Sequence, residues 1–164
     1  MKRIIFFALL GTFFSLNGYS QAKSASFSTL TCPEKWWVIW HPFKAQNALE
    51  ASVKTLYITD SIGNLGTVTD INGGRLDAFK HAYWMAILSK TIGEKAAIKL
   101  GKAHEKGNYK SFLKGKTEDG SLADKSASDM DLFNNNAGLQ IYLKNPKADE
   151  TALAALVIRS LLAG

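Results

Sequence analysis

The stretch RLDAFKHAYWMAILSKTIG, residues 75–93, decides the fold. Its apolar residues recur every three or four positions, which predicts an amphipathic helix over residues 75–91. Gly93 then ends the helix, since glycine is common just past a helix C-terminus. One stripe along this helix consists of Leu76, Phe79, Tyr83 and Ile87. A neighbouring stripe mixes polar and apolar groups and consists of Asp77, His81, Trp84 and Leu88.

Four more helices are expected around this one. The first starts at His41-Pro42, because proline suits a first helical turn. The second ends at Gly107, the third at Asn145-Pro146, and the last begins at the N-cap Asp149. The expected ranges are 43–58, 94–106, 126–144 and 149–162, with loops over 60–74 and 107–125. The sequence therefore predicts an all-α fold, a compact bundle of about five helices with the apolar last helix at its centre.

A short aromatic segment precedes the bundle. Residues 36–40 read WWVIW, and this composition favours a strand or an extended segment laid over the core. Sugar stacking is the alternative role for its tryptophans, and core packing is preferred. Cys32, the one cysteine, is expected to be buried, with an intermolecular disulfide as the alternative. We divide the chain into a signal peptide (1–22), a leader with the aromatic extended segment (23–42) and an α-helical domain (43–164).

The N-terminus is typical of a secretory signal peptide. Lys2 and Arg3 precede an apolar run from Ile4 to Phe14, and cleavage is expected after Ala22. An uncleaved anchor is the alternative, but a transmembrane helix needs about 20 apolar residues. The sequence thus predicts a periplasmic or secreted protein of bacterial type, with no transmembrane span once the signal peptide is removed.

The net charge is moderately positive. It is +6 for the whole chain and falls to +4 without Lys2 and Arg3. Lysines recur at helical spacing over residues 95–106, which is typical of a solvated helix face. An anionic surface or a protein partner is the alternative reading, and a nucleic acid is not expected.

Several polar residues lie on helix faces flanked by apolar residues. Asp77 and His81 are four residues apart and face the same way, so the carboxylate can fix the imidazole tautomer. Trp84 lies one turn further on and can shield the pair from water. His104 and Glu105 are adjacent, so both can enter one site only at a distorted helix end, which Gly107 would provide.

The helix expected over residues 126–144 carries a polar stripe as well. Asp131, Asn135 and Gly138 share one face, with Asn134 beside them. Buried carboxylates and amides need partners, and the acids and histidines above are the available ones. Gly138 would allow close approach by another helix or by a ligand.

Three blocks of this sequence resemble an uncharacterised bacterial domain family. They are DAFKHAYW from Asp77, AHE from Ala103 and MDLFNNNAG from Met130, and the family pattern reads DAxRHAxW, AHE and MDLxNNxxG. Such domains occur in exported proteins and at the C-terminal ends of polymorphic-toxin-like proteins. The resemblance spans residues 73–142, and Lys80 replaces an expected arginine. It implies that one unit is formed by Asp77, His81, Trp84, His104, Glu105, Asp131, Asn134 and Asn135.

Two functional hypotheses follow. The first is a hydrolase, in which His81, His104 and Asp131 hold a divalent metal, or His81 acts as general base with Glu105 or His104 as acid. Asn134 and Asn135 complete this centre, and Lys80 and Trp84 contact the substrate. The second is a non-catalytic binding domain, in which the same residues form a structural hydrogen-bond network. Zincin, Walker and nucleophile-elbow motifs are absent from the sequence.

Overall fold

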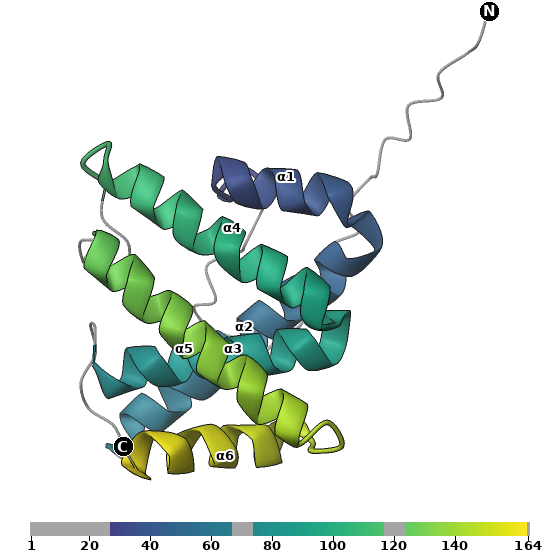
Figure 1. Cartoon of the computed structure of the whole chain (residues 1–164), viewed down its shortest axis with the longest axis vertical. Coiled ribbons are helices and arrows are strands. Elements are labelled where there is room, and N and C mark those ends of the chain that lie inside the picture. The colour runs from purple at the N-terminus through teal and green to yellow at the C-terminus, as the bar shows by residue number, and fades with distance from the viewer. Residues whose placement is uncertain (1–26, 67–73, 117–123, 164) are drawn as a thin grey trace, which may run out of the picture.

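The computed structural model describes residues 27–66, 74–116 and 124–163 (Figure 1). These residues form helices and no strand, which confirms the all-α bundle. The signal peptide expected over residues 1–22 lies outside them, as do positions 67–73 and 117–123 of the expected loops. The six helices are α1 (Cys32–Trp40), α2 (Pro42–Asn64), α3 (Arg75–Ile92), α4 (Glu94–Phe112), α5 (Lys125–Lys144) and α6 (Glu150–Ala163).

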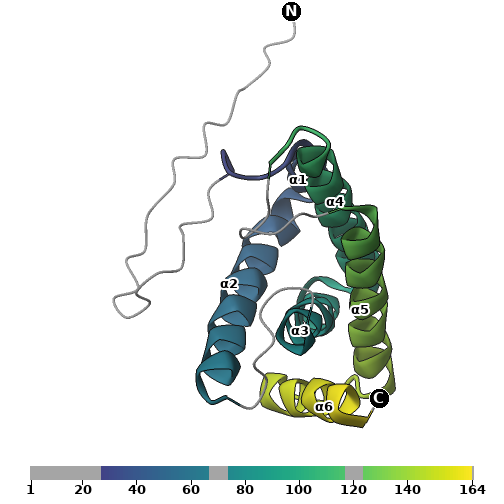
Figure 2. The same cartoon turned by 90° about the vertical axis from the view of Figure 1, so that its left-hand side faces the viewer.

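Helix α3 is the centre of the molecule. Figure 2 shows it nearly end-on, enclosed by α2, α4, α5 and α6, and it contacts all four. Its inner residues are almost completely excluded from solvent, Phe79, Ala86 and Leu88 being 0% exposed. The expectation that the last helix lies at the centre is therefore wrong. Helix α6 covers one end of the bundle and fully buries only Leu153 and Val157.

Helices α3 and α5 approach each other closely at Gly138. A Cβ atom on Gly138 would lie 1.9 Å from the carbonyl oxygen of Ala82 and 2.8 Å from its Cα. Two helix backbones reach such proximity only where one residue has no side chain. The sequence-based expectation that Gly138 permits close approach is thus confirmed, and the approaching element is the α3 backbone.

The aromatic segment is a helix and not an extended strand. The N-cap of α1 is Thr31, whose backbone N–H donates to the carboxylate of Glu34 at 2.7 Å. Pro33 fits the first turn, where its missing N–H costs nothing. Trp37 then anchors the helix, because its indole N–H donates to the Ala96 carbonyl at 3.1 Å. These contacts outweigh the weak β preference of valine, isoleucine and tryptophan.

Two other helices run further than the sequence indicates. Helix α4 does not end at Gly107 but continues to Phe112, and Gly107 lies buried inside it. A glycine stands at this buried position because a Cβ atom on residue 107 would lie 2.2 Å from the Thr31 hydroxyl oxygen. This glycine makes room for the start of α1. Helix α2 likewise continues to Asn64, into the expected loop.

Several apolar residues face outward. Cys32 is exposed, contrary to the expected burial. Of the three tryptophans in the aromatic segment Trp37 is buried in the core, whereas Trp36 and Trp40 are 56% and 76% exposed. On α5 the polar stripe faces inward and Phe133 is 71% exposed. In the part of the chain described, none of the helices combines the length and hydropathy needed to cross a membrane.

Replacing Gly138 by alanine should strongly destabilise the fold. The added methyl group forces α5 away from the rigid α3 backbone, and we expect the free energy of unfolding to fall by at least about 2 kcal/mol. Gly101→Ala is the matched control, since its Cβ would meet side chains and no neighbouring backbone: the flexible end of Met85 at 2.6 Å and the Asn135 amide nitrogen at 3.6 Å. Urea unfolding followed by circular dichroism measures both. Equal stability of the two variants would contradict the proposed role of Gly138.

Candidate functional site

The candidate site is built around His81, which lies in the middle of α3 with its side chain 5% exposed. Asp77 stands one turn earlier on the same helix, and its carboxylate oxygen is 3.8 Å from His81 Nε2. The i, i+4 spacing predicted this proximity from the sequence.

Two neighbouring helices supply further carboxylates to the same imidazole. Asp131 on α5 places an oxygen 3.4 Å from His81 Nε2. Glu105 on α4 places an oxygen 3.7 Å from the other ring nitrogen, Nδ1. Both acids are buried, at 11% and 3% side-chain exposure. The buried imidazole is therefore surrounded by three carboxylates from three helices.

Three of these side chains lie close enough together to hold a metal ion. Asp77, His81 and Asp131 each offer one ligand atom, and the three atoms lie within 4.8 Å of one another. Imidazole nitrogen and carboxylate oxygen are ligands for zinc and manganese. Glu105 behind Nδ1 matches the carboxylate that commonly orients a metal-binding histidine. We refer to Asp77, His81 and Asp131 as the His/Asp cluster.

Two residues support the cluster from its sides. The ammonium of Lys80 lies 2.7 Å from the Asp77 carboxylate. The amide of Asn135 donates to Glu105 at 3.2 Å, and its Oδ1 is buried with no hydrogen-bond partner among the described residues. Asn134 is half-buried beside Asn135 on α5 and makes no hydrogen bond to the cluster within the described part. Asp131 and Asn135 are thus the residues of the polar stripe of α5 that reach His81 and Glu105.

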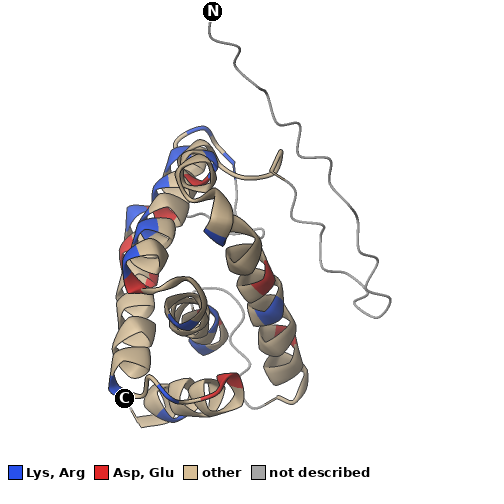
Figure 3. Cartoon of the chain, turned by 90° about the vertical axis from the view of Figure 1, so that its right-hand side faces the viewer, with Lys and Arg blue, Asp and Glu red and all other residues tan. Residues whose placement is uncertain are grey.

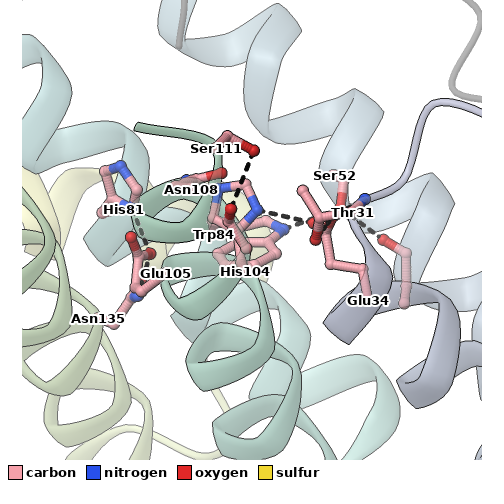
Figure 4. A network of polar contacts seen from close by, with 12 residues as sticks. Thr31, Glu34, Ser52, His81, Trp84, His104, Glu105, Asn108, Ser111 and Asn135 are labelled. Carbon is pink, nitrogen blue, oxygen red and sulfur yellow. Dashed lines mark hydrogen bonds and ion pairs between the residues drawn. The ribbon is translucent and has the colours of Figure 1, made fainter. Parts of the chain in front are cut away.

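His104 belongs to a second network, on the other side of α4 (Figure 4). Its Nδ1 lies 2.8 Å from a carboxylate oxygen of Glu34 on α1, and its Nε2 lies 3.2 Å from the Asn108 amide nitrogen. Helix α4 is regular through residues 104 and 105, so these adjacent side chains point in different directions. His104 is therefore not part of the ligand group formed by Asp77, His81 and Asp131.

The two networks are neighbours. The rings of His81 and His104 have centroids 6.3 Å apart, and the ring of Trp84 lies 5.2 Å from that of His104. The Trp84 indole donates to the Ser52 hydroxyl on α2 at 2.8 Å. Of the eight residues expected to form one unit, seven thus lie at two adjacent centres, with Trp84 beside the second, whereas Asn134 makes no hydrogen bond to either centre within the described residues.

Sequence reasoning missed Glu34, which holds the second network together. Burial raises the pKa of this carboxyl, but hydrogen bonding to His104, the charge of His104 and hydrogen bonds from Thr31 outweigh it. The net result is a pKa lowered from 4.5 to about 2. The sequence did hold a signal, because Thr31 and Glu34 have the spacing of a capping box, which marks a helix start.

Glu34 should make the fold sensitive to acid. Its pKa is lower in the folded state, so the unfolded chain binds the extra proton as the pH falls from 4.5 to 2. The stabilisation is complete above pH 4.5 and disappears towards pH 2, and we expect it to be on the order of 2 kcal/mol. The difference in free energy of unfolding between wild type and Glu34→Gln should be smaller at pH 2.5 than at pH 6, by about this amount. Urea unfolding measures it, with the exposed Glu50→Gln as control.

Comparison with curated proteins and with solved structures gives no match. A family model described as "Domain of unknown function (DUF6973)" matches residues 35–164. The match includes the His/Asp cluster, Glu105 and His104, and it extends well beyond residues 73–142, for which the sequence motifs indicated a family. Glu34 lies one position before its start. The chain therefore belongs to the DUF6973 family, a family of domains of unknown function.

Proposed function

We propose that this domain binds a divalent metal ion at the His/Asp cluster and uses it for hydrolysis. One observation carries the proposal. Nε2 of the buried His81 faces the carboxylates of Asp77 and Asp131 at 3.8 and 3.4 Å, while a third carboxylate stands behind Nδ1. Burying that much negative charge around one imidazole is costly unless a cation compensates it.

The geometry favours metal binding over acid–base catalysis by His81. A catalytic base needs one ring nitrogen directed at the substrate. In His81, however, one nitrogen faces Glu105 and the other faces two aspartates, so both directions are taken by protein groups. His81 is better suited to be a ligand, with Glu105 and Asn135 holding its ring in place.

The ligand set also supports a hydrolytic role. Three protein ligands leave coordination positions for water, and a divalent metal lowers the pKa of bound water towards neutrality. Lys80, beside Asp77, would supply a positive charge close to an ion bound by that carboxylate. Anionic substrates such as phosphodiesters fit this combination best, since their charge grows towards the transition state. Lipids and cell-wall material are further candidates.

A non-catalytic binding domain is the second candidate. The observation in its favour is that the neighbouring network joins α1 to α4 through hydrogen bonds, from His104 to Glu34 at 2.8 Å and to Asn108 at 3.2 Å. A doubly protonated His81 would compensate the same carboxylates as a metal would. The polar residues would then only join α3, α4 and α5.

Metal analysis separates the two candidates. We expect the purified protein to contain about one zinc or manganese ion per chain, and a chelator to lower its melting temperature by about 5–10 °C, because a bound ligand stabilises the folded state. Asp131→Asn should lose the metal and the chelator effect. Turnover of bis(p-nitrophenyl) phosphate should disappear with them.

Asp129→Asn is the matched control, since Asp129 lies two positions earlier on α5 and its exposed carboxylate pairs with Lys125 at 2.6 Å. This variant should keep the metal. The metal site would be excluded if the purified wild-type protein held no metal, its melting temperature did not change with a chelator, and Asp131→Asn still lowered that temperature. The structural hydrogen-bond network would then be the remaining explanation.

We also propose that the protein works outside the cytoplasm. The charged start, the apolar run from Ile4 to Phe14 and the resemblance to exported, toxin-associated domains support this. After expression in a Gram-negative host, Edman sequencing of the periplasmic protein should begin at Lys23. A cytoplasmic product that keeps Met1 would contradict export.

A further inference from the structure

An aromatic surface at the junction of α1 and α2 is not explained by the cluster. Trp36, Ile39, Trp40 and Phe43 are 56%, 53%, 76% and 97% exposed. Trp36, Ile39 and Trp40 share one side of α1 by their helical spacing, and Phe43 follows on the first turn of α2, just beyond the non-helical His41. We call these four residues the aromatic face. Folded monomers seldom expose so many large apolar side chains together without a use for them.

The aromatic face is firmly held by the residues behind it. Trp37, on the opposite side of α1, is 5% exposed, donates to the Ala96 carbonyl and stacks on His41 with ring centroids 4.7 Å apart. Glu34 binds His104 at 2.8 Å. Helix α1 is therefore fixed against α4, and its outer side chains project from a rigid support.

The charge around the aromatic face is positive. Residues 27–49 contain Lys35 and Lys44, and their one acidic residue, Glu34, is turned inward to His104. Helix α4, on which α1 packs, adds a row of exposed lysines (Figure 3), namely Lys95, Lys99, Lys102, Lys106 and Lys110. An anionic surface would therefore attract this end of the molecule.

We propose that the aromatic face inserts into the interface of an anionic lipid bilayer. Tryptophan and phenylalanine prefer the boundary between headgroups and acyl chains, and lysines beside them reach the phosphates. Phe43, at 97% exposure, projects almost freely. Acyl chains accept such a side chain without a matching pocket, which a protein partner would have to provide. This proposal does not depend on the metal site.

Tryptophan fluorescence tests it on the full chain. All four tryptophans lie at or after position 36, so the apolar residues 4–14 add no signal of their own. With vesicles of phosphatidylcholine and phosphatidylglycerol we expect a blue shift of the emission and quenching by brominated acyl chains. Pure phosphatidylcholine should bind less protein. Trp40→Phe should remove much of the quenching, since Trp37 is buried and cannot reach the lipid.

Trp40→Ala combined with Phe43→Ala should weaken partitioning to anionic vesicles at least tenfold in a flotation assay. Phe133→Ala is the matched control, because this residue is 71% exposed but lies on α5, and it should bind like wild type. Unchanged partitioning of the double variant, or no quenching at all, would overturn the proposal. So would self-association that the double variant abolishes in sedimentation, or binding to glycans without binding to vesicles.

Discussion

The contact between Gly138 and Ala82 sets the geometry of the rest of the molecule. It lets α5 lie directly on the backbone of α3, with no side chain between them at that point. Asp131 and Asn135 are on the same stripe of α5, two turns and one turn earlier, so the same contact brings them to His81 and Glu105. A wider spacing would separate the carboxylate of Asp131 from the imidazole. The absence of a side chain at Gly138 thus determines both the packing of α5 on α3 and the geometry of the site.

Local signals in the sequence predicted most of the helices. Gly93 ends α3 with a positive φ of 85°, Asp149 caps α6 by accepting the Ala152 N–H at 2.8 Å, and Asn145-Pro146 follows α5. These features depend on residues close in sequence, so they can be read without the fold. The position of α3 at the centre could not be read in this way. The apolar composition of α6 predicts that place for it, but the arrangement of helices in space depends on how the faces of all of them fit together.

The errors share a physical cause. The aromatic segment reads as extended by propensity, yet Trp37 and Glu34 gain partners on α4 only if it is helical. Gly107 reads as a helix end, yet its lack of a side chain serves a contact with Thr31. In both places residues about 60 to 75 positions apart decide the local structure. A single sequence carries no direct sign of such contacts.

The candidate site could be predicted in part, because some of its contacts depend on residues close together in the sequence. Helical spacing pairs Asp77 with His81 and Asp131 with Asn135, and the need of buried polar groups for partners brings the two pairs together. His104 and Glu105 were placed in one site only because Gly107 was expected to distort the helix end, whereas α4 continues to Phe112 and keeps the two side chains about 100° apart. Glu34 lies in the leader before the aromatic segment, where no helix was predicted, so its capping-box spacing with Thr31 was not used.

His104 and Glu105 point in different directions from α4, and this restricts how the helix can change in length. A residue added or removed between Glu94 and Ala103 would turn both side chains by about 100° around the helix axis. His104 would leave Glu34 and Glu105 would leave His81 in the same event, so α1 and the cluster would be disturbed together. Amino-acid replacements in the lysine row of α4 leave the directions of His104 and Glu105 unchanged. Relatives that keep both networks should therefore differ in the composition of this row and agree in the number of residues between Gly93 and His104.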